Sequence, residues 1–267
     1  MFERLKHSRL FIFSFFTYLV FWCMLLLTFV LISCRPPRYI QEIAQNLCAW
    51  SPTIVVLILF KKLFPQTSLR DFLRDSFFKK INPLDFVFSF LLQVLFLCAM
   101  IGIYLVISKK TLGSLEFIGI NELFMTFIIN LTSGPLGEEL GWRGYAINEL
   151  QKRYSPLYSS VLLGLIWGFW HFPLWLISGL YGLRLLVYIL SFLLAIVSTS
   201  ILITLFYNKS KNVVIAMWIH FWFNFLLKLV NIDIVYMLGI ISAVYFIVII
   251  TISFYKKEMV KCPEKVF

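Results

Sequence analysis

The sequence predicts an all-α integral membrane protein that crosses the bilayer about eight times and has both termini in the cytoplasm. Its 267 residues are 61% hydrophobic and 18% aromatic, with a mean hydropathy of +0.89, which far exceeds the apolar share of a soluble domain. Several apolar runs reach the roughly 20 residues that a helix needs to cross the hydrocarbon core. They lack the alternation over about ten residues that is typical of barrel strands, so helices are expected.

Five segments are clear candidates for transmembrane helices because each is apolar almost without interruption. In chain order they are 10–33, 86–107, 156–177, 185–207 and 234–255. Three further segments contain polar residues and complete the predicted set: 41–60, 121–147 and 212–230. We expect a single membrane domain over residues 1–267, with the chemically informative motifs in core helices at 121–228.

Lysine and arginine residues set the expected orientation, since cytoplasmic loops of membrane proteins carry an excess of both. If the N-terminus is inside, 17 of the 24 lie in inside segments and six in outside segments, while Arg143 lies within a span. The net charge of +11 is then explained by topology and by contact with anionic headgroups. We therefore expect the lipid bilayer as a partner and no nucleic acid.

The end of the first span offers an alternative to an uncleaved helix. Residues 31–34 resemble a lipoprotein signal box that ends in an acylated Cys34, but the apolar run before it is longer than the about 7 to 15 residues of a signal peptide. We therefore expect an uncleaved first helix. The five cysteines show no CxxC spacing and are interpreted as packing residues.

The loop at 61–82 has apolar residues at roughly helical spacing among charged ones. These residues are Leu69, Phe72, Leu73, Phe77 and Phe78. The spacing predicts an amphipathic helix on the cytoplasmic membrane surface, and a solvated basic connector is the alternative.

Two adjacent carboxylates and an arginine, Glu138, Glu139 and Arg143, lie within the predicted span 121–147. A charge near the bilayer centre costs about 3 kcal/mol on insertion scales, so such residues are interpreted as functional. Glu139 and Arg143 are four residues apart and are expected to pair on one helix face. Glu138 is rotated by about 100° and is expected to have no local partner. Nearby glycines would let another helix or backbone come close: Gly134, Gly137, Gly141 and Gly144.

Two histidines also lie within predicted spans. His171, in an aromatic helix, is either a packing residue or a functional one, and Pro173 would weaken the backbone ladder and open a polar pocket beside it. His220 and Asn224 are four residues apart, so they share a helix face that is expected to point inward. Counting about 1.5 Å per residue places Glu138, His171 and His220 at similar depths, which predicts one site near mid-membrane. Such a set can activate water and hold an oxyanion.

Three motifs in this order resemble the CPBP family of intramembrane proteases. They are Glu-Glu-x-x-x-Arg at 138–143, an aromatic-x-x-x-His helix at 167–171 and His-x-x-x-Asn at 220–224. The family includes CAAX prenyl endopeptidases and bacterial relatives tied to bacteriocin processing and self-immunity. The resemblance covers 121–228, and this chain has Trp167 where the family usually has phenylalanine. It implies an endopeptidase that hydrolyses a peptide bond in a membrane-associated peptide or protein.

The resemblance also implies roles for the site residues. Glu138 with His171 would activate the attacking water, and His220 with Asn224 would stabilise the oxyanion. Glu139 and Arg143 would hold the helix and the charge balance of the pocket. The family is commonly labelled metalloprotease, and one carboxylate with two histidines could bind Zn²⁺ and leave a position for water. The sequence lacks His-Glu-x-x-His, and a metal-free mechanism with a desolvated glutamate is the alternative.

Two other classes of function use the same residues differently. A non-catalytic membrane scaffold or immunity factor would keep the pocket for a partner, and an ion-coupled transporter would use the buried charges as a proton relay. The absence of an inverted repeat counts against the transporter. The lysine- and phenylalanine-rich composition favours a bacterial plasma membrane, and because bacteria generally lack CAAX prenylation, it favours a substrate without a prenyl group.

Overall fold

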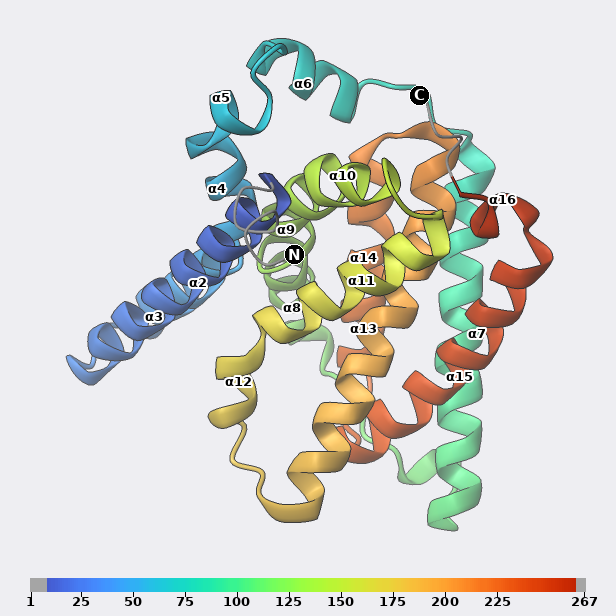
Figure 1. Cartoon of the computed structure of the whole chain (residues 1–267). Helices are drawn as coiled ribbons and strands as arrows, with labels where there is room; N and C mark the ends of the chain where they lie inside the picture. The colour runs from blue at the N-terminus through green and yellow to red at the C-terminus, as the bar shows by residue number, and fades with distance from the viewer. Residues whose placement is uncertain (1–8, 263–267) are drawn as a thin grey trace.

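The computed structural model describes residues 9–262, which fold into helices and contain no named strand, and this confirms the predicted all-α class (Figure 1). Arg4, Lys6 and Lys265, which entered the topology prediction, lie outside the described residues. The longer helices are α2 (Arg9–Ser33), α3 (Arg38–Cys48), α7 (Pro83–Ser108), α8 (Ile120–Thr132), α11 (Pro156–Trp170), α13 (Gly182–Ser210), α14 (Val213–Lys228) and α15 (Ile234–Tyr255). The shorter ones are α4 (Ser51–Ile58), α5 (Phe60–Leu63), α6 (Leu69–Phe77), α9 (Pro135–Gly141), α10 (Ile147–Gln151), α12 (Phe172–Leu176) and α16 (Lys257–Val260).

Within residues 9–262, four helices are long and apolar enough to cross a membrane: α2, α7, α13 and α15. Helices α11 and α14 are apolar but shorter. The chain is therefore a multi-pass integral membrane protein. The number of crossings and the side on which the termini lie stay predictions.

Three of the predicted spans are interrupted rather than continuous. The segment 41–60 is divided among α3, α4 and α5, with Pro52 near the start of α4. The segment 121–147 breaks at Gly134 before Pro135, and the segment 156–177 ends its main helix at Trp170, just before His171 and Pro173. Proline lacks the N–H of the helical ladder and disfavours a helical residue before it, so it fits the first turn of a new helix.

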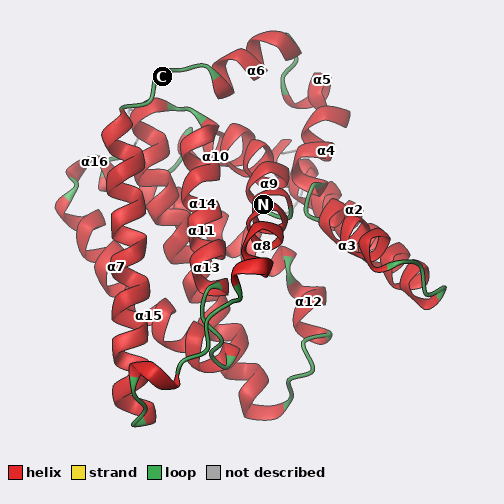
Figure 2. Cartoon of the chain, turned by 180° about the vertical axis from the view of Figure 1, so that it is seen from behind, coloured by secondary structure: helices red, strands yellow, loops and turns green. Residues whose placement is uncertain are grey.

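Helices α2 and α3 form a hairpin that extends to one side of the molecule, as both views show (Figures 1 and 2). The main bundle on the other side contains α7, α11, α13, α14 and α15, and α9 with α10 lies between the two parts. Helix α11 approaches α13 closely at Gly164 because glycine has no side chain. An added Cβ would lie 2.7 Å from the Cα of Val197. This layout puts α9 in contact with both α4 and α14.

Three of the segments predicted to be cytoplasmic, near residues 77–79, 151–153 and 209–212, lie together at one end of the described chain. The side-chain amide of Asn212 donates to the backbone oxygens of Phe77 (2.9 Å) and Lys79 (2.6 Å), and Lys211 donates to Gln151 (3.3 Å). At the opposite end, the amide of Asn231 donates to the carbonyl of Glu116. The two groups of loops lie at opposite ends of the described chain, with helices between them (Figure 1).

The loop predicted to contain an amphipathic helix forms α6, which begins after a Ser68 side chain that caps the amide of Asp71. Phe72 is buried and its ring packs against the rings of Phe60 and Phe64, whereas Phe78 is 82% exposed. The helix itself is confirmed, and part of its apolar face contacts the protein. Its position on the membrane surface stays a prediction.

Candidate active site

Helix α9 carries the carboxylates because the chain restarts a helix at Pro135. Glu138 lies in its first turn, and its amide donates to the carbonyl of Gly134 (2.8 Å). Two glycines let α9 approach α4: a Cβ on Gly137 would lie 2.8 Å from the Trp50 ring, and one on Gly141 would lie 2.5 Å from the Cβ of Pro52. The prediction that these glycines allow a close approach is confirmed.

Glu138 has two hydrogen-bond donors, so the expectation of no local partner is wrong. Its Oε2 accepts from the indole nitrogens of Trp142 (3.2 Å) and Trp167 (2.5 Å). Trp142 follows Glu138 by four residues on the same helix face, and Trp167 comes from α11. Indole N–H groups are neutral donors, so a pattern of charges in the sequence does not indicate them. The other oxygen, Oε1, accepts no hydrogen bond from the described residues.

Glu139 has a different environment, in which it pairs with two cationic or ionisable groups. Its Oε1 accepts from the guanidinium of Arg143 (3.0 Å) and from Nδ1 of His220 (2.8 Å). The pairing with Arg143 confirms the prediction from spacing, and both side chains are fully buried. The Arg143 guanidinium also stacks on the Trp167 ring, 4.6 Å from its centroid. Glu139 thus links α9 to α14 through His220.

His171 lies where α11 ends and α12 begins. Its Nδ1 is 2.9 Å from the carbonyl oxygen of Trp167, one turn earlier. Because a carbonyl only accepts, Nδ1 carries the proton, and the neutral imidazole has a lone pair on Nε2. The break before Pro173 therefore places this histidine at a helix end with its orientation fixed.

His220 and Asn224 lie together against the backbone at Gly134. A Cβ added to Gly134 would be 3.2 Å from Nε2 of His220 and 3.2 Å from Nδ2 of Asn224. The Asn224 amide makes no side-chain hydrogen bond with the described residues. The His220 ring also meets the Trp167 ring edge-on, with centroids 4.9 Å apart. The predicted face of α14 does point inward.

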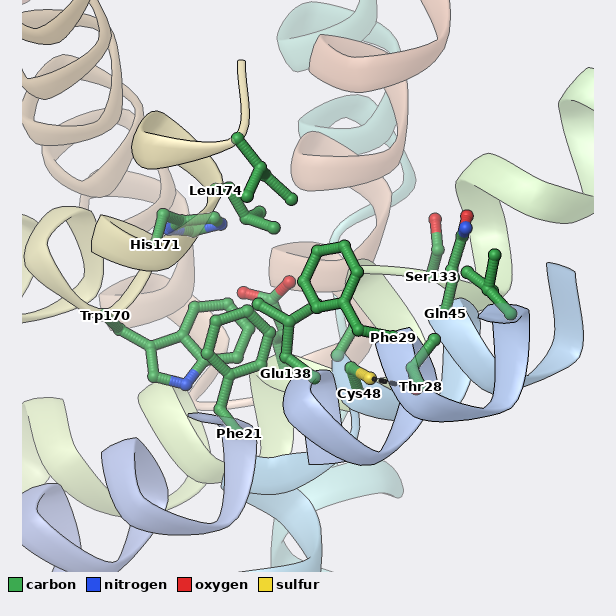
Figure 3. Close-up of a pocket in the computed structure, with 14 residues that line it drawn as sticks. Phe21, Thr28, Phe29, Gln45, Cys48, Ser133, Glu138, Trp170, His171 and Leu174 are labelled. Carbon is green, nitrogen blue, oxygen red and sulfur yellow. Dashed lines mark hydrogen bonds between the residues drawn. The ribbon is translucent and has the colours of Figure 1, made fainter. Parts of the chain in front are cut away.

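A cavity of about 330 Å³ lies between the α2–α3 hairpin, α9 and α12. Glu138 and His171 both line it, and their side chains point into it (Figure 3). Ser133 lines it next to Gly134, whereas His220 and Asn224 are not among its lining residues. The structure thus brings all six predicted side chains to one region, with two facing the cavity and the others at or behind its wall.

The same region matches known proteins. Residues 120–226 match the family described as type II CAAX prenyl endopeptidase Rce1-like. The chain is also 31% identical over 185 residues to CAAX prenyl protease 2 of Methanococcus maripaludis, an alignment that covers 65% of this chain and 67% of that relative. The chain belongs to the Rce1-like CAAX prenyl endopeptidase family. This confirms the resemblance to CPBP intramembrane proteases, and all three motifs lie within the matched residues.

Catalytic zinc in proteins uses three protein ligands and a water. In the Rce1-like site, the atoms still open to a metal are Oε1 of Glu138 and Nε2 of His171 and of His220, because Oε2 of Glu138 accepts from two indoles and both histidines donate through Nδ1. Over residues 9–262, no three side chains of His, Cys, Asp or Glu are grouped to hold a metal ion. The donor set as placed does not fit a zinc ion with three protein ligands.

Sequence reasoning missed several residues that shape the Rce1-like site. Trp142 and Trp167 bind Glu138, and Asn148 donates to the carbonyls of Arg143 (2.9 Å) and Gly144 (3.2 Å). Those two carbonyls belong to a π-helical turn, Trp142–Ala146, that follows α9. Trp142 had a signal in its spacing of four residues from Glu138. The contact of Trp167 depends on tertiary packing, and the contacts of Asn148 depend on the π turn.

Proposed function

We propose that this chain is an intramembrane endopeptidase in which Glu138 and His171 activate a water molecule. The observation that carries the proposal is that a carboxylate oxygen without a hydrogen-bond partner and an oriented imidazole face one cavity (Figure 3). Glu138 is the better candidate base of the two carboxylates, because Glu139 is paired with Arg143, accepts from His220 and does not line the cavity.

In the first step, the water oxygen bonds to the carbonyl carbon of the substrate while its proton passes to Oε1 of Glu138. Nε2 of His171 accepts the second hydrogen bond of that water and fixes its direction. In the second step, the C–N bond breaks as the proton passes from Glu138 to the leaving amine. The water thus supplies one oxygen to the new carboxylate, and no covalent enzyme intermediate forms.

His220 and Asn224 are proposed to stabilise the oxyanion from the Gly134 side of the cavity. Nδ1 of His220 donates to Glu139, so Nε2 donates as well when the ring is doubly protonated. Glu138, Glu139, Arg143 and His220 then have a net charge of zero, which reduces the cost of burying them. The Asn224 amide is a neutral second donor. Each good donor is worth about 3 to 4 kcal/mol in soluble proteases.

Glu139 and Arg143 are proposed to position these groups rather than to react. Glu139 holds His220 through Nδ1, and Arg143 stacks on Trp167 while it pairs with Glu139. Because neither side chain lines the cavity, they act through their neighbours.

The substrate is proposed to be an apolar, membrane-bound peptide segment. The cavity is lined mainly by apolar side chains, and Glu138 is its one carboxylate among the lining residues. Those apolar residues are Phe21, Leu25, Phe29, Ile32, Trp170, Leu174 and Ile177. The relative from Methanococcus maripaludis is named CAAX prenyl protease 2, so a prenylated CAAX peptide is one proposed substrate class, and a bacteriocin leader or another unprenylated peptide is the alternative.

The test uses purified protein in liposomes with three peptide probes, followed by mass spectrometry of the products. The probes are a farnesylated peptide that ends in a CAAX box, the same peptide without farnesyl, and an apolar leader-type peptide. We expect wild type to cleave at least one, and Glu138→Gln and His171→Ala to lower the rate by about 10² to 10⁴-fold. Glu42→Gln, which alters an exposed ion pair on α3, is the control and should cleave normally. Equal rates for wild type and Glu138→Gln would rule out this mechanism.

A further inference from the structure

The eight tryptophans of the chain all lie within the described residues, and two of them converge on a single carboxylate oxygen. Three others donate to backbone oxygens: Trp22, Trp50 and Trp218. The remaining three have buried indole nitrogens without an acceptor: Trp170, Trp175 and Trp222. The two donors to Glu138 therefore differ from the rest in what they bind.

Trp167 holds the shorter of the two contacts and touches four of the six candidate site residues. Besides the 2.5 Å bond to Glu138, its carbonyl accepts from His171, its ring lies under Arg143, and its edge meets His220. It is 2% exposed. A phenylalanine at this position could keep the packing of the ring but would have no N–H to donate.

The two indole donors make the oxygens of Glu138 inequivalent. Oε2 is bound twice, whereas Oε1 has no donor among the described residues and the side chain faces the cavity. A carboxylate with one oxygen fixed in this way keeps one orientation, since rotating it would break two charge-assisted hydrogen bonds in a buried site.

We propose that Trp167 is a positioning residue for the catalytic carboxylate: its indole N–H binds Oε2 of Glu138 and thereby directs Oε1 at the water. The catalytic consequence rests on the proposed function. The contact itself does not, so the two can be tested separately. On this account, the tryptophan at this position adds a function that phenylalanine cannot supply.

The first arm of the test measures the contact without any substrate. Infrared spectra are recorded for the reconstituted wild type and for the Glu138→Gln variant. The difference between the two spectra gives the carboxylate band of Glu138. The same difference is then taken in the backgrounds Trp167→Phe and Trp175→Phe. We expect the band to move in Trp167→Phe and to stay in place in Trp175→Phe, which removes a buried indole N–H that has no acceptor. An unmoved band in Trp167→Phe would overturn the proposal.

The second arm measures turnover of whichever probe wild type cleaves. We expect Trp167→Phe to lower kcat by at least about tenfold, with KM nearly unchanged, because a hydrogen bond to a charged group is lost while the cavity keeps its shape. Replacing Trp167 with benzothienylalanine, which has sulfur in place of the N–H, separates the donor from the ring. It should behave as Trp167→Phe does. Wild-type kcat in the benzothienylalanine protein would overturn the proposal even if Trp167→Phe is inactive through poor folding.

Discussion

At the scale of single residues, Glu138 and Glu139 show how neighbouring carboxylates acquire different chemistry. Glu139 is bound by Arg143 and His220, so its charge is compensated and its Oε1 is already shared by two donors. Glu138 is bound only by neutral indoles, and one of its oxygens stays available in the cavity. The environment of each group, and not its residue type, decides which carboxylate can accept a proton from water.

Gly134→Ala tests the proposed oxyanion donors, His220 and Asn224. The added methyl group would lie 3.2 Å from both Nε2 of His220 and Nδ2 of Asn224, so it would cover the two donors without a severe clash. We expect kcat to fall by about 10² to 10³-fold, as when a donor is lost. The variant should keep its thermal unfolding midpoint within a few degrees. Gly119→Ala, where the new Cβ meets nothing within 4 Å, is the control. Unchanged turnover by Gly134→Ala would contradict the assignment.

At the scale of secondary-structure elements, the sequence predicted where apolar segments lie and which residues pair along one helix. The ion pair of Glu139 with Arg143 and the shared face of His220 with Asn224 both follow from a spacing of four. The breaks at Gly134 and before Pro173 were harder to place, because proline is also tolerated as a kink within transmembrane helices. Contacts between helices, such as that of Trp167 with Glu138, depend on packing that one sequence does not determine.

Gly141→Ala tests the contact between α9 and α4. A Cβ at this position would lie 2.7 Å from the backbone carbonyl carbon of Pro52, which a rotamer change cannot relieve. We expect a loss of about 1 to 3 kcal/mol in unfolding free energy from overpacking, together with lower activity because α9 carries Glu138. Thermal or denaturant unfolding in detergent measures the loss of unfolding free energy. Gly102→Ala in α7, where nothing lies within 4 Å, is the matched control, and equal stability of the two variants would contradict the packing argument.

At the scale of the whole molecule, hydrogen bonds join the loops at each end of the helices, and the site lies between the two ends. Lys211, just after α13, donates to Gln151 and Asn208 and lies over the ring of Tyr207. It thus joins the end of α13 to Gln151 at the end of α10, the short helix that follows α9 and its π turn. Burial, together with the positive charge of Lys79, lowers the pKa of Lys211 from 10.5 to about 8.

This pKa shift predicts a pH dependence of stability. Between about pH 8 and 10.5 the unfolded chain holds the proton that the folded protein has released, so the unfolding free energy rises with pH through this window. Below pH 8 both states are protonated and the folded protein bears the full cost of the buried charge. We expect Lys211→Met to remove this part of the pH dependence, measured as unfolding midpoints in detergent at pH 7.5 and 10. The same slope in wild type and variant would contradict the burial of this lysine.

The most direct test of the central claim is a single-turnover cleavage in H₂¹⁸O, with mass spectrometry of the new C-terminal carboxylate. If Glu138 acts as the base for an attacking water, the first turnover places one ¹⁸O in the product, and Glu138→Gln yields almost none of that product. A first-turnover product without ¹⁸O would mean that an enzyme carboxylate attacked the peptide, and unimpaired ¹⁸O incorporation by Glu138→Gln would mean that another group activates the water. Either result would contradict the mechanism derived from this site.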